Sequence, residues 1–435
     1  MIISKYIMKS VFGIIFGIVT LLFYIFIPGC RMGPESLNVN DTMKSEKEVQ
    51  SARILPFSGM LQTVINLNTR LFDGQGVSAA IVTNNHRYWT GTGGYSESGN
   101  PVNTDMLFNI GSIGKNFLAA LILQLAEEGR LSLDDPLSKW GLGSSTIDEN
   151  ITIRQLLNHT SGIFDWVEHP QSPFILPYSQ IEFERIWTQD EILTLFAGDP
   201  YFQSGYGWNY STTNYNLLKV IAEKTTGTTV PSEISKRFLQ PLGLEHTITL
   251  DTGTRIPSHL YLAHGWFDVN GDGEAEDISG DSQNWIISMS PNMMYASAID
   301  LANWSQALYE GRELSKTSLN EMLNFHHPTP GEPPITGYGL GTAEISLKGL
   351  IRFYGHLGFH YGNISAMLYL PKLHTSLAVL TNGNNQLYQY IISFNLLTAI
   401  VLIRLRYFLY AAILVLVLFV SWGTWKRAGR HRQGF

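Results

Sequence analysis

The sequence has a single cysteine, Cys30, among its 435 residues. One thiol cannot form a disulfide within the chain, and it cannot supply the several thiolates of a structural zinc site. The chemistry of any active site must therefore come from other residue types.

Charged residues are also scarce, at 15% of the chain, whereas 44% of the residues are hydrophobic. The hydrophobic fraction is typical of globular proteins, which excludes disorder of the whole chain. The formal net charge is −7, and the basic residues form no long stripe except near the C-terminus. Nucleic-acid-binding proteins need a clustered basic surface, so this class of partner is excluded.

Residues 1–30 have the pattern of an export or anchoring segment. Lys5 and Lys9 precede an apolar run from Val11 to Ile27, which is typical of a signal peptide or an N-terminal membrane anchor. The run ends just before Cys30, in a sequence that resembles a lipoprotein cleavage box. A lipid on Cys30 and an uncleaved anchor remain alternatives, and both place the following residues outside the cytoplasm.

The other end of the chain predicts a second membrane segment. Residues 407–425 carry no charge and have Tyr and Trp near their edges, which is typical of a transmembrane helix, and residues 426–435 form a basic cytoplasmic tail. Residues 31–53 are polar and predict a linker. We therefore expect a folded domain over residues 54–403, held in a membrane and facing outward.

Within the folded domain, strand patterns lie near both ends. Residues 76–95 predict a β-hairpin turned at Asn84 and Asn85. Similar β-rich runs return only at residues 350–354, 364–370 and 376–380. Most of the chain between them has helical periodicity, as at residues 112–128 and 215–224. This order predicts a mixed α/β fold, with an antiparallel sheet built from the N- and C-terminal parts, flanking helices and an inserted helical subdomain.

Ser112 and Lys115 open the predicted helix over residues 112–128. Side chains at positions i and i+3 share a helix face, so the Lys115 amine is expected to reach the Ser112 hydroxyl. A serine hydroxyl needs an adjacent base to act as a nucleophile, and a lysine amine in a low-dielectric site can be that base. Because such spacings also arise by chance, the alternative is a helix-capping serine beside a solvated lysine.

Further motifs give this pair a context. Their sequences are LFNIGSIGKNF, ITIRQLLNHTSGI, WNYSTTNYNLL, AIDLANWSQAL, YGLG, YGHLGFHYG and LAVLTNG. These stretches resemble, in the same order, the serine β-lactamase superfamily, which includes class C β-lactamases, D-alanyl-D-alanine carboxypeptidases and related esterases and peptidases. The resemblance extends from about Leu61 to Asn384 and implies a β-lactamase/transpeptidase-like fold.

The resemblance also implies roles for individual residues. Ser112 corresponds to the acylated nucleophile, Lys115 to its base, and Tyr210 to the tyrosine that passes a proton to the leaving group. His356 and Gly358 lie in the third motif of the family, on a strand at the edge of the cleft. The backbone N–H of Phe359 would complete an oxyanion hole with that of Ser112.

One position departs from the family pattern. Thr212 stands where the family usually has an asparagine that holds a substrate amide, which puts β-lactam hydrolysis in doubt. The expected function is a membrane-anchored serine hydrolase acting on peptide, ester or β-lactam acyl groups, of the carboxypeptidase or esterase type. The alternative is a penicillin-binding sensor or scaffold that is acylated slowly or not at all.

Two further expectations concern ligands. Asp268, Asn270 and Asp272 alternate as in the first half of a calcium loop, but Ser279 occupies the twelfth position and no flanking helices are evident. An acidic surface turn is the favoured interpretation, and the implied chemistry needs neither a metal nor another cofactor. The expected partners are a small-molecule or peptide substrate, the membrane and, as a candidate, peptidoglycan. His159 is expected to have a structural role.

Overall fold

The computed structural model describes most of the predicted folded domain. The described residues are 55, 57–71, 75–85, 87–251, 254, 256–257, 260–280, 284–326, 335–347, 351–383, 388–390 and 392–400. Both predicted membrane segments, the linker, Cys30 and the basic tail lie outside these residues. Within them, no helix combines the length and apolar character that crossing a membrane requires.

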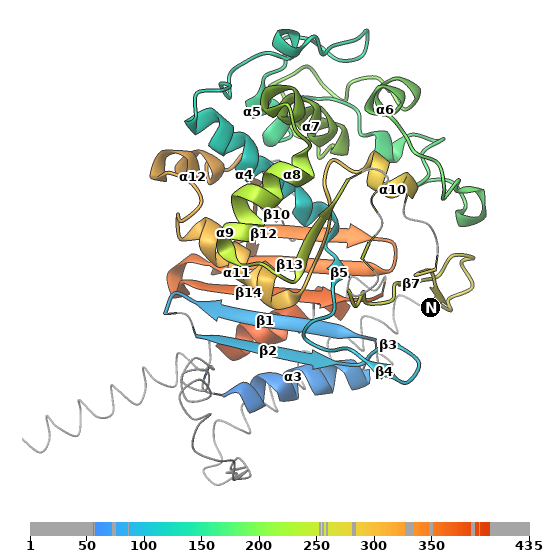
Figure 1. Ribbon diagram of the computed structural model, residues 1–435, viewed down its shortest axis with the longest axis vertical. Helices are drawn as coiled ribbons and strands as arrows, with labels where there is room; N and C mark the ends of the chain where they lie inside the picture. Colours follow the sequence, from blue (N-terminus) through green and yellow to red (C-terminus); the bar gives the residue numbers. More distant parts are fainter. Residues whose placement is uncertain are drawn as a thin grey trace, which may run out of the picture.

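A seven-stranded sheet forms the centre of the fold (Figure 1). Its strands, in spatial order, are β10 (Ile335–Tyr338), β11 (Ala343–Leu347), β12 (Ile351–His360), β13 (Asn363–Leu370), β14 (Thr375–Thr381), β1 (Val77–Thr83) and β2 (Tyr88–Gly93). Every neighbouring pair is antiparallel. Because β1 pairs with both β2 and β14, the two ends of the domain join within one sheet, which confirms the predicted sheet topology.

Side chains alternate between the two faces of this sheet. Val77, Ala79 and Ile81 of β1 belong to the core that includes α3 (Ser58–Leu71), whereas Ala80 and Val82 belong to the core on the opposite face. The helix α11 (Ala298–Tyr309) contacts β1, β13 and β14. All seven residues of β1 are buried, as expected for a strand covered by helices on both sides.

The residues between β2 and β10 form the inserted, mainly helical part (Figure 1). Its other helices are α4 (Gly114–Glu127), α5 (Ile153–Leu157), α6 (Gln189–Leu195), α7 (Thr212–Thr226), α8 (Val230–Ile234), α9 (Gln240–Leu242), α10 (Asn284–Met289) and α12 (Lys316–Met322). A small sheet adds β5 (Phe108–Asn109), β9 (Met293–Ala296) and β6 (Thr247–Leu250). The short hairpins are β3 (Tyr95–Glu97) with β4 (Asn100–Pro101), and β7 (Trp266–Phe267) with β8 (Glu276–Asp277).

Two predicted helix starts differ from the structure. The helix expected from residue 112 is preceded by a 3₁₀ turn, Gly111–Ile113, and α4 begins only at Gly114. Gly111 has φ of 51°, a left-handed conformation that breaks the regular helix before Ser112. Conversely, α7 begins at Thr212, three residues before the predicted start. The extended Ser211 occupies the N-cap position, although its side chain makes no capping hydrogen bond.

The stretch with the calcium-like spacing joins β7 to β8, so strands and not helices flank it. Asp268 accepts hydrogen bonds from the backbone N–H groups of Gly271 and Gly273, at 2.7 and 2.9 Å, and Asn270 accepts one from Asp272. No group of His, Cys, Asp and Glu side chains suited to a metal ion was found among the described residues. The acidic side chains thus stabilise their own turn.

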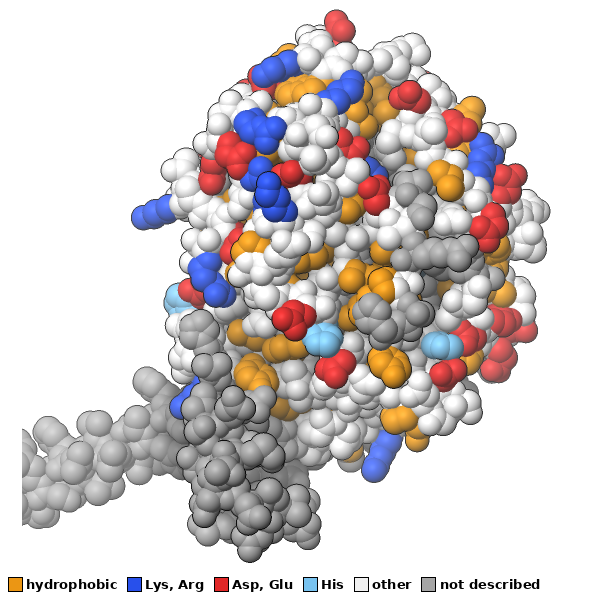
Figure 2. All heavy atoms as spheres, viewed as in Figure 1, with side chains coloured by type: hydrophobic (Ala, Val, Ile, Leu, Met, Phe, Trp, Pro, Cys, Tyr) orange, Lys and Arg blue, Asp and Glu red, His pale blue; other side chains and the backbone are white. Residues whose placement is uncertain are grey.

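On the face shown in Figure 2, acidic and basic side chains are interspersed.

Candidate active site

Ser112 lies in a turn that is pressed against the sheet. The backbone N–H of Gly111 donates to Asn109 Oδ1 at 2.9 Å, and that of Ile110 donates to the Met294 carbonyl at 3.1 Å. A Cβ atom added to Gly111 would lie 2.7 Å from the backbone nitrogen of Phe359. Only glycine permits this approach, so the turn places Ser112 beside β12.

Lys115 occupies the first turn of α4 and is 5% exposed. Its Nζ donates a hydrogen bond to Ser112 Oγ at 3.1 Å. The same Nζ lies 5.1 Å from the ring centroid of Tyr210 and 5.9 Å from that of Tyr215. The expected contact between Ser112 and Lys115 is therefore present, beside two aromatic rings.

Tyr210 lies just before α7, and His159 fixes this part of the backbone. His159 is fully buried with φ of 60°, and its Nδ1 accepts a hydrogen bond from the backbone N–H of Ser211 at 3.1 Å. The imidazole also lies 4.3 Å from the Tyr210 ring, centroid to centroid. This arrangement agrees with the structural role expected for His159. The Tyr210 hydroxyl is buried and has no hydrogen-bond partner among the described residues.

Thr212 and Asp165 meet at the start of α7. The Asp165 carboxyl accepts hydrogen bonds from the backbone N–H groups of Thr212 and Val167. Burial nevertheless raises the pKa of Asp165 to about 6, because removal from water disfavours the carboxylate more than these two donors stabilise it. Asp165 lines the same cavity as Ser112, and a carboxyl with a raised pKa in a cleft is a candidate functional group.

The third motif lies on β12, with both ring nitrogens of His356 engaged. Its Nδ1 lies 2.6 Å from the Leu357 carbonyl, and its Nε2 lies 2.8 Å from the hydroxyl of Tyr338. Burial, together with nearby Lys115, lowers the pKa of His356 to about 4, so the ring is neutral near pH 7. Nδ1 therefore carries the proton and donates to Leu357, and Nε2 accepts from Tyr338. The imidazole supports the wall of the cleft, and neither of its nitrogens is free for a substrate carboxylate.

Gly358 allows β12 to approach the nucleophile. A Cβ atom there would lie 2.0 Å from the Ile110 carbonyl oxygen and 2.3 Å from Ser365 Oγ. Ser365 Oγ in turn donates to the Ile110 carbonyl at 2.8 Å, which ties β13 to the turn before Ser112. The backbone of Phe359 thereby lies against this turn, as the predicted oxyanion hole requires.

Two cavities meet at Ser112. The catalytic pocket, of about 440 Å³, is lined by Ser112, Lys115, Asp165, Tyr210, Thr212 and Phe359, with an apolar wall that includes Trp166, Phe174 and Met293. A smaller cavity of about 210 Å³ is lined by Ser112, Tyr210 and residues 356–359. Together they bring all the predicted site residues to one cleft, although the catalytic roles of these residues stay predictions.

The sequence reasoning missed Asp165, Tyr338 and His360, which also border this region. Asp165 lies two residues after the end of the quoted ITIRQLLNHTSGI stretch, so its position beside a matched motif was a usable signal. Tyr338 begins the quoted YGLG stretch, but nothing in the sequence indicates its contact with His356. The wall position of His360 depends on how β12 ends, which the sequence does not reveal.

Comparison with protein families gives a match over most of the domain. The sequence model of the family described as Beta-lactamase matches residues 68–397. Among curated proteins, Penicillin-binding protein 4* of Bacillus subtilis is 26% identical over 299 residues, which are 66% of this chain and 64% of the relative. Protein flp of Staphylococcus aureus is 26% identical over 336 residues, 75% of this chain and 63% of the relative. The chain thus spans less than two thirds of the length of these two relatives.

Solved structures show the same architecture. A D-stereospecific amidohydrolase from a Streptomyces species is 30% identical with a TM-score of 0.67, and the match covers 77% of this chain and 97% of the other. The D-amino acid amidase of Ochrobactrum anthropi, complexed with L-phenylalanine amide, has a TM-score of 0.67 at 24% identity, over 80% of this chain and 99% of the other. The amidase comparison shows the shared fold.

Proposed function

Since this chain belongs to the Beta-lactamase family, we propose that it is a serine hydrolase that works through an acyl-enzyme on Ser112. One observation carries the proposal: Lys115 Nζ donates to Ser112 Oγ at 3.1 Å within a cleft that also holds Tyr210 and the edge of β12. A nucleophile and a base in hydrogen-bond contact are the minimal requirement for acyl transfer.

The proposed reaction has two halves. The uncharged form of Lys115 takes the proton of Ser112 Oγ, and Oγ attacks the substrate carbonyl carbon. The N–H groups of Ser112 and Phe359 stabilise the oxyanion. The bond to the leaving nitrogen or oxygen then breaks. Tyr210 gives its hydroxyl proton to this atom and takes back the proton that Lys115 received from Ser112. Water finally cleaves the ester to Ser112 and releases the acid.

The state of Tyr210 supports its proposed role. A buried hydroxyl without a hydrogen-bond partner costs about 1 to 3 kcal/mol. A substrate whose leaving atom accepts a hydrogen bond from this hydroxyl would recover part of that cost. Tyr210 lines both cavities at Ser112, so it borders either side of the scissile bond.

We propose amides or short peptides of D-amino acids, and the corresponding esters, as substrates. The apolar wall of the catalytic pocket favours an acyl group with an apolar side chain. The names of the solved amidohydrolase and amidase point to the same class. A β-lactam is a poorer candidate, since His356 is neutral and internally bonded and Thr212 lacks the amide of asparagine. Peptidoglycan peptides remain the proposed natural form of such a substrate.

A slowly acylated sensor is the second candidate. It is favoured by the curated relatives, one of which is named as a penicillin-binding protein and not as a hydrolase. The rate at which the acyl group leaves Ser112 distinguishes the two functions: release within seconds supports the hydrolase, and persistence for hours supports the sensor.

The proposed location is a membrane, with the catalytic domain outside the cytoplasm. Support comes from the apolar and basic pattern of residues 1–30 and 407–435. A reporter that is active only outside the cytoplasm, fused after Phe435, is expected to be silent. Activity of this reporter would reverse the predicted orientation of the C-terminal segment.

The central test is covalent labelling of the full chain with a fluorescent fluorophosphonate and, in parallel, with a fluorescent penicillin. Ser112→Ala should abolish labelling by both probes while the circular dichroism spectrum stays unchanged, because the Ser112 side chain caps no helix. The exposed Ser138→Ala is the matched control and should label normally. Undiminished labelling of the Ser112 variant would refute the proposal.

A further inference from the structure

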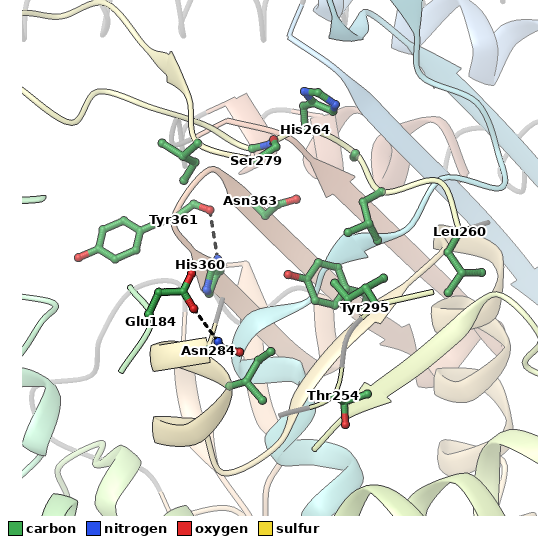
Figure 3. A pocket seen from close by; sticks show the side chains of 16 residues that line it. Glu184, Thr254, Leu260, His264, Ser279, Asn284, Tyr295, His360, Tyr361 and Asn363 are labelled. Carbon is green, nitrogen blue, oxygen red and sulfur yellow. Dashed lines mark hydrogen bonds between the residues drawn. The ribbon is translucent and has the colours of Figure 1, made fainter. Parts of the chain in front are cut away.

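A third cavity follows the two cavities at Ser112 along β12. The small cavity is lined by residues 356–359, the catalytic pocket by Phe359 and His360, and the third by His360 and Tyr361. We call this third space the distal cavity; its volume is about 530 Å³ (Figure 3). His360 borders both the catalytic pocket and the distal cavity, so the two spaces are neighbours.

His360 presents a hydrogen-bond acceptor at this boundary. Its side chain is 7% exposed, Nδ1 bonds to the Tyr361 carbonyl at 3.1 Å, and Nε2 has no partner among the described residues. Burial lowers the pKa of His360 to about 4, so the ring is neutral at pH 7. Because the proton resides on Nδ1, which donates to a carbonyl, Nε2 can only accept.

Asn363 offers a second acceptor. Its side chain is 6% exposed, and its Oδ1 lacks a partner among the described residues. A Cβ atom on Gly265 would lie 3.1 Å from Asn363 Nδ2, so the nitrogen end of the amide faces the backbone at Gly265. In Figure 3, Asn363 and Tyr295 both project into the cavity. Two buried, unsatisfied acceptors in one cavity are unusual unless a ligand or water completes them.

The charge of the residues that line the distal cavity also favours a ligand that donates hydrogen bonds. Glu184 lies at the rim, where its Oε2 accepts from Asn284 Nδ2 at 2.9 Å. No lysine or arginine is among the described residues that line the distal cavity. A lining of this kind attracts groups that donate hydrogen bonds or carry positive charge, and it disfavours a carboxylate or phosphate.

We propose that the distal cavity is a substrate subsite that receives the free amino group of the substrate, on the side of the scissile bond opposite His356. The proposal rests on the proposed hydrolase function and adds the length and polarity of the substrate. An extended chain advances about 3.3 Å per residue, so two residues lead from the position beside Phe359 to that beside Tyr361. The preferred substrate is therefore an extended peptide amide with a free amino group, two residues longer than the group that fills the catalytic pocket.

Three amides test this assignment in the full chain by release of ammonia. They are N-acetyl-D-phenylalanine amide, glycylglycyl-D-phenylalanine amide and the N-acetylated form of the latter. We expect the free-amine peptide to have a kcat/KM about tenfold above that of the other two, the scale of one hydrogen bond to a charged donor.

Substitutions at Asn363 test whether the advantage of the free-amine peptide arises in the distal cavity. Asn363→Leu should remove most of the tenfold advantage, chiefly through KM. Asn363→Asp, which keeps the acceptor, should retain the advantage, and this rescue separates lost recognition from misfolding. Asn320→Leu is the matched surface control, since Asn320 is exposed and lines none of the three cavities.

The outcomes separate the two proposals. If no amide is hydrolysed although Ser112 is present, the proposed function fails and the subsite fails with it. If all three amides are hydrolysed at equal rates, or the advantage persists in Asn363→Leu, the hydrolase stands and the subsite is refuted.

Discussion

Replacement of Asp165 by asparagine should change how the stability of the protein depends on pH. Asp165 is 6% exposed, and burial raises its pKa to about 6 from an ordinary value of 3.8. A carboxyl with a higher pKa in the folded chain than in the unfolded chain binds its proton more tightly when folded. The stabilisation that Asp165 contributes to the folded state is therefore fully present at low pH. It is lost as the pH rises through the interval from 3.8 to about 6.

The size of the effect follows from the two pKa values. Each pKa unit corresponds to 1.36 kcal/mol, so the buried carboxylate costs about 3 kcal/mol above pH 6 relative to the protonated acid. Asparagine does not titrate, and its amide oxygen can still accept from one of the two N–H donors, those of Thr212 and Val167. The loss of the second hydrogen bond lowers the free energy of unfolding by an amount that does not depend on pH. This amount cancels when the stabilities at two pH values are compared.

Urea unfolding followed by circular dichroism, at pH 4, 5, 6 and 7, measures this difference. The free energy of unfolding of Asp165→Asn, relative to the unmutated chain, should increase by about 2 kcal/mol between pH 4 and pH 7, since part of the full effect is already present at pH 4. Asp190→Asn, which removes an exposed carboxylate, gives the reference for a solvated group. A difference that stays constant with pH, or that changes in the opposite direction, would contradict the assignment of a strained buried carboxylate.

Three more substitutions test the cleft. Lys115→Ala should slow acylation by a fluorophosphonate at least about 100-fold, the usual scale of general-base assistance. The control Lys139→Ala, at an exposed lysine, should leave the rate unchanged. A loss of only a few-fold in Lys115→Ala would exclude Lys115 as the base. Gly358→Ala should lower the free energy of unfolding by about 1 to 3 kcal/mol and slow acylation, because its Cβ would lie 2.0 Å from the Ile110 carbonyl oxygen. An unchanged melting temperature and acylation rate would show that β12 does not pack closely against this turn. Thr212→Asn should raise kcat/KM for a chromogenic cephalosporin relative to an aryl ester, and an unmutated protein that already prefers the cephalosporin would refute this reasoning.

The sequence predicted the sheet best where strand patterns are long and bounded by turns. The hairpin turned at Asn84 and Asn85 and the strands near residues 350–380 are present. The strands β10 and β11 were missed, because they are short and their role is set by pairing with β12. Such pairing is a tertiary interaction that local periodicity does not encode.

The candidate site was predictable to a similar degree. The contact between Ser112 and Lys115 follows from their spacing, although the local turn is 3₁₀ and not α. The hydrogen bond between His356 and Tyr338 could not be foreseen. The two residues come from different strands, and no sequence pattern indicates that their side chains meet. Burial of Asp165 likewise depends on how α7 packs, which no single-sequence pattern reveals.

The pairing of β1 with β14 has a consequence for synthesis of the protein. Val77 pairs with Thr381, so nearly the whole domain must emerge before the sheet can be closed. Until then, β1 and β2 form a two-stranded hairpin with one long apolar edge exposed, an arrangement that is marginally stable in water and prone to aggregate. Non-local pairing of this kind slows folding, since the loop-closure entropy is lost before the contacts form. A chain that ended before Thr375 would lack the strand between β13 and β1, and its two halves would have no common sheet.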